Sequence, residues 1–194
     1  MAKEKKEKKK GSCLKTLLIV IVVIVIIGVI AAIAGGGDDE PTVVDNDRQN
    51  SSQPQESEPE KTEFSVGETV ELNDVQVTLV SSTESAGSEF VTPDSGNVFL
   101  LLEFEIANNS DSDITISSIA NFEAYCDDYS VSQDIVGLQA PEAEGKNQLD
   151  GSVAAGKKMN GVIAYQVPSD YSTFEISVSP DFWSANDIKF VISK

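Results

Sequence analysis

The sequence predicts an all-β fold, an antiparallel β-sandwich, held behind a single membrane-spanning helix. Three observations lead to this prediction. An uncharged apolar run occupies residues 16–34, the net charge has opposite sign on the two sides of this run, and apolar and polar residues alternate from Phe64 onward. The part of the chain behind the run leaves room for one globular domain of about 130 residues, which suffices for a single core.

The apolar run from Thr16 to Ala34 has 19 residues without a charge and consists mostly of Leu, Ile and Val. As an α-helix it would extend about 28 Å, close to the ~30 Å hydrocarbon thickness of a bilayer. β-branched residues are poor helix formers in water, but in lipid the helix is favoured because the main-chain amides have no other partner. We therefore predict a transmembrane helix over residues 16–34.

The charges on either side of this run indicate the direction of the span. Residues 1–15 form a basic stub with seven lysines, whereas residues 38–194 carry 30 acidic residues against seven lysines and arginines. By the positive-inside rule the stub is cytoplasmic and the C-terminal part is extracellular. We interpret the lysines as a topology signal that also attracts anionic headgroups, rather than as a tail for nucleic acid.

A cleaved signal peptide is the competing interpretation of the apolar run. Ala32-Ile33-Ala34 matches the small-x-small pattern of a cleavage site. The run is longer than the roughly 7–15 apolar residues typical of a signal peptide, so we favour an uncleaved anchor. A lipoprotein anchor does not fit, because Cys13 precedes the apolar run instead of following it.

Residues 35–63 are predicted to form a disordered acidic linker. Three glycines end the apolar run, and acids, Ser, Gln, Asn and Pro then dominate, which leaves little to bury. We expect a self-repelling spacer that carries the domain away from the membrane.

Residues 64–194 show the period-two alternation of half-buried strands. In one run, Leu100, Leu102, Phe104 and Ile106 share a face. Polar turns such as 108–111 and 155–157 separate the runs, and no helix-period stretch of useful length appears. Each run buries one face, so two sheets must stack to cover them. The seven runs lie at 75–79, 100–106, 114–116, 122–126, 163–167, 174–178 and 188–192.

Segments across this domain resemble a known family. They lie at 67–70, 75–78, 99–110, 122–125 and 149–168. Residues 64–194 resemble the immunoglobulin-like domain of unknown function found in membrane-anchored proteins and lipoproteins of Gram-positive bacteria. The resemblance implies an immunoglobulin-like sandwich, similar in fold to a secreted immunoprotective bacterial antigen. It implies no ligand and no catalytic residue.

The composition excludes several kinds of catalytic site. The sequence has no histidine, so it can form neither a Ser-His-Asp or Cys-His pair nor a histidine-ligated zinc site. Cys13 and Cys126 lie on opposite sides of the predicted span and cannot pair within one chain. We expect Cys126 to be a buried apolar residue rather than a reactive thiol, because it shares a strand face with Phe122 and Ala124. Neighbouring acids would raise the pKa of its thiol.

Two acidic pairs could in principle contribute to a calcium site, Asp111 with Asp113 and Asp127 with Asp128. Calcium needs about six or more converging oxygens, and the sequence has no EF-hand spacing. We interpret Asp111 and Asp113 as turn formers, and calcium binding by the acidic loops stays open.

Three aromatic residues, Tyr171, Phe182 and Trp183, lie in or beside turns near the last strands. If exposed, they would mark a patch for a ligand or partner. We expect them instead to close one end of the sandwich core.

These features together predict a membrane-anchored extracellular binding or interaction module without catalytic activity, cofactor or metal site. The expected contacts are the membrane, through residues 16–34, and another envelope protein or a cell-wall component. Nucleic acid is not expected, because the acidic domain repels phosphate. A structural or accessory subunit of an envelope complex is the alternative. The identity of the ligand and the oligomeric state stay open.

Overall fold

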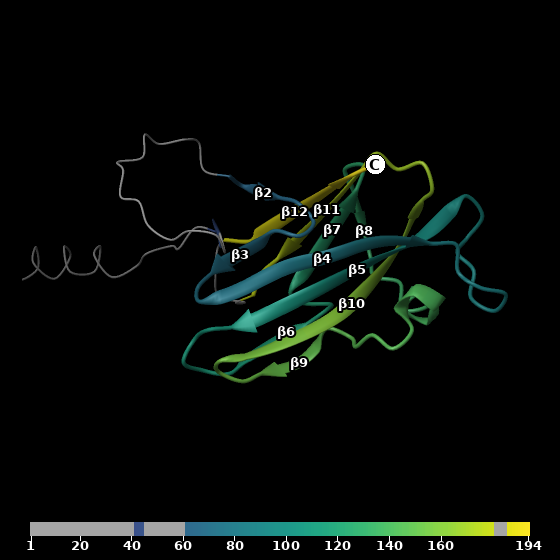
Figure 1. Ribbon diagram of the computed structural model, residues 1–194. Helices are drawn as coiled ribbons and strands as arrows, with labels where there is room; N and C mark the ends of the chain where they lie inside the picture. Colours follow the sequence, from purple (N-terminus) through teal and green to yellow (C-terminus); the bar gives the residue numbers. More distant parts are fainter. Residues whose placement is uncertain (1–40, 45–60, 181–185) are drawn as a thin grey trace, which may run out of the picture. The chain divides into compact units, whose positions relative to one another are not determined.

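Figure 1 shows the computed structural model of the chain, which describes residues 41–44, 61–180 and 186–194. The predicted basic stub (1–15), the predicted transmembrane helix (16–34) and most of the predicted linker (35–63) lie outside these residues. In the part of the chain that is described, no helix has the length and apolar character needed to cross a membrane.

Within the described residues, the strands form two five-stranded sheets and a two-stranded ribbon. The first sheet has the order β1-β3-β4-β5-β10, with β1 (Thr42–Val43), β3 (Thr69–Leu72), β4 (Val75–Ser85), β5 (Asn97–Asn108) and β10 (Lys157–Pro168). The second has the order β2-β12-β11-β7-β8, with β2 (Glu63–Phe64), β12 (Ile188–Ser193), β11 (Thr173–Val178), β7 (Phe122–Cys126) and β8 (Tyr129–Val131). The ribbon pairs β6 (Ile114–Ser117) with β9 (Asp150–Val153).

The predicted antiparallel β-sandwich is confirmed. Each of the seven predicted runs falls within a strand, namely β4, β5, β6, β7, β10, β11 or β12. The alternation of apolar and polar residues along these strands follows the alternation of buried and exposed positions. Every second residue of β7 and of β11 is buried. The strand pairs are antiparallel except β2 with β12, which run parallel.

The core lies between the two sheets and is rich in aromatic side chains. The ring of Phe104 on β5 lies 5.3 Å from that of Phe122 on β7 and 6.0 Å from that of Phe190 on β12. Tyr165 on β10 packs 5.1 Å from Phe174 on β11. These tilted ring pairs contribute about 0.5–1.5 kcal/mol each beyond the area that they bury, so they join the two layers strongly.

Two short 3₁₀ turns, η1 (Gly137–Gln139) and η2 (Pro141–Ala143), cover part of the outer face of the first sheet. Phe99 and Leu101 of β5 are buried there together with Ala140 and Ala143. This cover explains why residues 99–102 are continuously apolar: the strand is buried on both faces at this point.

One strand and the first residue of another come from the predicted linker. Thr42 and Val43 pair with β3 at the edge of the first sheet, and Glu63–Phe64 pairs with β12. Thr42 and Val43 are β-branched, which suits them to a strand.

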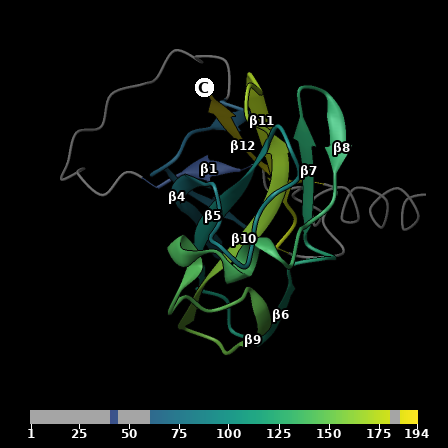
Figure 2. The same ribbon diagram turned by 90° about the vertical axis from the view of Figure 1, so that its right-hand side faces the viewer.

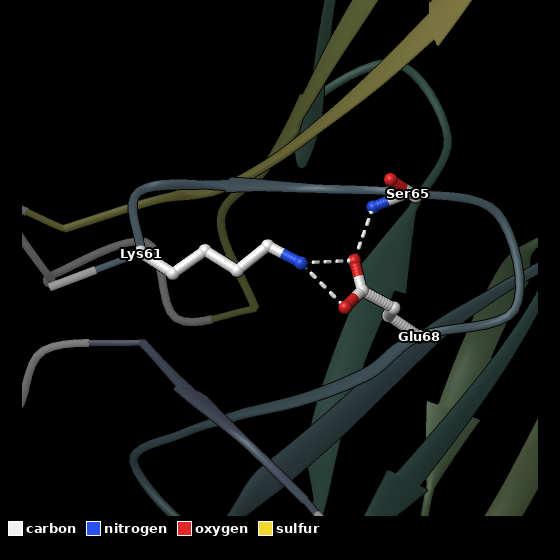
Figure 3. A network of polar contacts seen from close by, with 3 residues as sticks. All are labelled: Lys61, Ser65 and Glu68. Atoms are coloured by element: carbon white, nitrogen blue, oxygen red, sulfur yellow. Dashed lines mark hydrogen bonds and ion pairs between the residues drawn. The ribbon is translucent and has the colours of Figure 1, made fainter.

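A polar network fixes the entry into β3 (Figure 3). The carboxylate of Glu68 accepts hydrogen bonds from Lys61 Nζ at 2.7 Å and from the main-chain N–H of Ser65 at 2.6 Å. Burial alone would raise the pKa of Glu68, but these hydrogen bonds outweigh it and hold the pKa below the ordinary glutamate value. The turn between them contains Gly67 at φ 90°, a conformation that glycine adopts without strain.

Candidate functional site

A groove of about 450 Å³ lies beside β7 and β8, where the chain leaves β8 toward β10. Figure 2 shows β8 next to β7 at the margin of the second sheet. We call this cavity the β8 groove. It is lined by residues of β7 and β8, by Ile119 of the loop before β7, by Ser132, Gln133 and Ile135 after β8, and by Tyr165 of β10.

The hairpin that positions this groove has a two-residue turn. Asp127 and Asp128 both have left-handed backbone, with φ of 45° and 69°, as a type I′ turn requires. The Asp127 carboxylate also accepts hydrogen bonds from the main-chain N–H groups of Ser172, at 3.0 Å, and Thr173, at 2.9 Å. The structure thus places these two acids in a turn, and Asp127 additionally ties the hairpin to β11.

The outer edge of β8 offers main-chain hydrogen-bonding groups. In a two-residue hairpin the residues that flank the turn, here Cys126 and Tyr129, exchange hydrogen bonds, and the next pair does not. That next pair is Tyr125 with Ser130, so the N–H and C=O of Ser130 point away from β7. Among the described residues no strand pairs with this edge.

The sides of the groove carry exposed apolar side chains. Ile119 is 83% exposed, Ile135 75% and Tyr125 41%. Tyr129 and Val136 are exposed nearby, so five of the nine exposed large apolar residues in the described chain belong to this hairpin and its adjoining loops. Single exposed apolar residues are ordinary, whereas such a gathering is typical of an interaction surface.

The segment after β8 is joined to β10 beside the groove. Gln133 forms an isolated antiparallel main-chain bridge with Tyr165 of β10, and its side-chain Nε2 donates a hydrogen bond to the carbonyl of Ser118. The phenol of Tyr165 is buried. Burial raises the pKa of Tyr165, so its hydroxyl stays protonated at neutral pH. Among the residues that line the groove, Glu123 alone carries a formal charge at neutral pH.

The predicted site residues lie apart from the groove. Cys126 is buried and free, as predicted, and burial together with the charge of Asp127 raises the pKa of its thiol. Asp113 accepts a hydrogen bond from the main-chain N–H of Ala155 at 3.2 Å. In the described chain no group of three or more acidic or cysteine side chains is arranged to hold a metal ion.

Tyr171 is buried at the end of the sandwich, in agreement with its predicted role in closing the core. Burial raises the pKa of Tyr171 to about 12, and the nearby carboxylate of Glu84 adds to the effect. Lys194 Nζ lies 4.9 Å from the centre of the Tyr171 ring and 2.7 Å from the Glu84 carboxylate. Phe182 and Trp183 lie outside the described residues.

Sequence reasoning missed the groove and its residues. The signal that could have found them is an apolar residue outside the strand alternation: Ile119 stands between Ser118 and Ala120, and Ile135-Val136 follows Asp134. A residue that serves no strand face is free to face solvent.

Comparison with known proteins gives one family match, several structural matches and no curated relative. The family described as "Domain of unknown function (DUF4352)" matches residues 64–188. No curated protein matches the chain.

Solved structures with a similar fold include two from Bacillus subtilis. The ycdA protein, a candidate lipoprotein, matches with 18% identity and a TM-score of 0.51 over 71% of this chain, which spans only 39% of that protein. The yjhA protein matches with 19% identity and a TM-score of 0.49, over 67% of this chain and 98% of that protein.

A secreted Mycobacterium tuberculosis protein, MPT63, is a more distant structural match. It has 12% identity and a TM-score of 0.38, over 65% of this chain and 84% of that protein. At these identities the structural likeness concerns the fold.

Proposed function

The chain belongs to the DUF4352 family of domains of unknown function, as the sequence resemblance indicated, and we propose a function for it from the β8 groove. The chain is a membrane-anchored extracellular interaction module built on an immunoglobulin-like sandwich, and the β8 groove is its binding surface. It binds a partner and catalyses no reaction.

The gathering of exposed apolar side chains on the β8 groove carries this proposal. Ile119 and Ile135 keep 83% and 75% of their surface in water. Leaving an isoleucine exposed forgoes roughly 1.5–3 kcal/mol relative to burial. A partner that covers both side chains would gain much of this free energy, which makes the groove a favourable docking surface.

The chemistry of the groove supports binding rather than catalysis. Its carboxylate, Glu123, has no second acid among the lining residues, so no acid–base pair is present there. Burial raises the pKa of Tyr165, which makes its oxygen a poor nucleophile. The lining hydroxyls of Ser130 and Ser132 have no histidine to activate them, since the sequence has none.

The anchor and the linker complete the proposal. The apolar run of residues 16–34 holds the chain in the membrane with its N-terminus in the cytoplasm. The acidic linker then gives the domain reach toward a partner in the cell envelope, either a protein or a wall component.

Site-specific photo-crosslinking on intact cells tests this function. A photoreactive amino acid in place of Ile135 should give a discrete adduct with one envelope component. The same amino acid in place of Phe90, which is 90% exposed on a separate loop, serves as the control. Equal labelling from the two positions, or none from position 135, would show that the groove is not an interaction surface.

The accessory-subunit alternative has one observation in its favour. Isoleucines as exposed as Ile119 and Ile135 are typical of surfaces that stay covered by a permanent partner. A constitutive subunit would co-purify with its partner in fixed stoichiometry after gentle solubilisation, whereas a ligand-binding module would separate from it.

A further inference from the structure

We propose that the occupant of the β8 groove is an extended peptide segment whose apolar side chains are flanked by lysine or arginine, and which adds to the open edge of β8 as a further strand. This inference rests on the proposed function and specifies the class of partner. The partner's apolar side chains fill the groove, its main chain pairs with β8, and its cations meet an acidic rim.

The open edge of β8 is the first step of the argument. The N–H and C=O of Ser130 point away from β7, and no strand of the described residues pairs with this edge. Beyond the end of β8 the main chain turns to β10, where the Asp134 N–H donates to the Ala164 carbonyl, so the open edge is confined to Ser130. A peptide that exchanges hydrogen bonds with both main-chain groups of Ser130 would lie beside the apolar walls, which is the arrangement in which a peptide extends a sheet.

The apolar walls select the side chains of the occupant. Side chains of an extended segment alternate between its two faces, about 7 Å apart on each face. Ile119, Tyr125 and Ile135 line the groove, so one face of the segment can place apolar side chains among them. Its other face stays in water and is free to be polar.

The charges around the groove determine which residues can stand at the two ends of the bound peptide. Glu123 lines the groove, and Asp134 directly precedes the lining residue Ile135. No lysine or arginine is among the lining residues. Five lysines of the described chain form ion pairs elsewhere, namely Lys61, Lys146, Lys158, Lys189 and Lys194. An apolar groove with an acidic rim attracts a cationic segment and repels an acidic one.

Fluorescence polarisation with three labelled nine-residue peptides tests the proposal on the full chain in a non-ionic detergent. The first peptide alternates Val and Thr between paired lysines at its ends. The second carries glutamates in place of the lysines, and the third is the lysine peptide with alternate main-chain nitrogens methylated. We expect the lysine peptide to bind at least tenfold more tightly than either of the others.

Matched variants locate the binding. Ile135→Asp should weaken the lysine peptide at least tenfold, whereas Phe90→Asp should leave it unchanged. Glu123→Lys should shift the preference toward the glutamate peptide, whereas Glu89→Lys, on the same exposed loop as Phe90, should not. If Ile135→Asp alters the circular dichroism spectrum, Ile119→Asp replaces it, because Ile119 is still more exposed.

Equal affinity for the lysine peptide and its methylated form would overturn strand addition. If the groove variants bind the lysine peptide as tightly as their controls do, the peptide is held by the general negative charge of the chain. This result would refute the β8 groove as its binding site. If Ile135 still crosslinks to a discrete partner on cells while the peptides do not bind, the proposed function stands and the cationic peptide is the wrong occupant. If both experiments fail, the proposed function fails with it.

Discussion

The side chain of Asn108 should be among the most sensitive positions of the sandwich. Its amide Nδ2 donates to the carbonyls of Ser112, at 2.8 Å, and Val153, at 2.9 Å. Its Oδ1 accepts a hydrogen bond from the main-chain N–H of Ser110 at 3.1 Å. The residue is fully buried at the end of β5 and joins that strand to the 110–112 turn and to β9. We predict that Asn108→Ala unfolds the domain more readily than any exposed substitution nearby.

The magnitude follows from these three hydrogen bonds with the main chain; a fourth, from the Ser110 hydroxyl to Oδ1, is left out of the sum because that part-buried hydroxyl can turn to water. At a net value of about 1 kcal/mol each, Asn108→Ala should lower the free energy of unfolding by about 3 kcal/mol. For a domain of this size, that corresponds to a fall of about 10 °C in Tm. Asn108→Asp should cost more at pH 7, because an anionic oxygen would then face the two carbonyls that now accept from Nδ2.

Thermal unfolding of the full chain, followed by far-ultraviolet circular dichroism, measures both effects. Asn109→Ala is the control, since Asn109 is the next residue and is exposed. The native environment should raise the pKa of the carboxyl introduced at position 108, so the extra penalty should exist above its unfolded pKa of about 4 and shrink as the pH falls toward that value. A Tm for Asn108→Ala within about 2 °C of the Asn109→Ala value would refute the hydrogen-bond account.

Three further predictions concern the Asp127-Asp128 turn, Tyr171 and Gly161 within β10. Asp127→Ala should lower the free energy of unfolding by about 2 kcal/mol in chemical denaturation, because two main-chain amides lose their acceptor; Asp128→Gly should be neutral or slightly stabilising, since φ is 69° there. Tyr171, with a pKa of about 12 against an ordinary 10, should titrate late in absorbance at high pH. Because the unfolded chain loses this proton first, the stability contributed by Tyr171 should be full below pH 10 and fall between pH 10 and 12. Gly161→Ala should lower Tm, because a Cβ at this position would lie 2.8 Å from the main chain of Gln148.

The strands that could be predicted are those that bury one regular face over several residues. Phe174, Ile176 and Val178 of β11 are all buried, and the residues between them are partly exposed. Such alternation leaves only one register that keeps the apolar side chains out of water. Local sequence and tertiary burial agree in these strands, so the sandwich could be recognised from them alone.

The strands that escaped prediction are short, and their neighbours determine them. β8 has three residues, of which only Val131 packs against the core, and β9 reads Asp150-Gly151-Ser152-Val153 with a single buried side chain. Neither contains enough alternation of apolar and polar residues to predict a strand. β8 forms because the Asp127-Asp128 turn folds it back onto β7, and β9 forms because its main chain pairs with that of β6.

The β8 groove could not be predicted either. It lies where β8 ends, and β8 is too short to be recognised from the alternation of its residues. A longer β8 would continue the second sheet, and its side chains would fill the space between the sheets. Instead the chain crosses after Val131, and Gln133 already bridges to Tyr165 of the first sheet. This crossing closes the core while leaving Ile119 and Ile135 outside it, so the two isoleucines can change without loss of packing. A substitution at either position that abolishes binding while Tm stays constant would therefore report on the surface alone, which separates a functional role for the groove from a structural one.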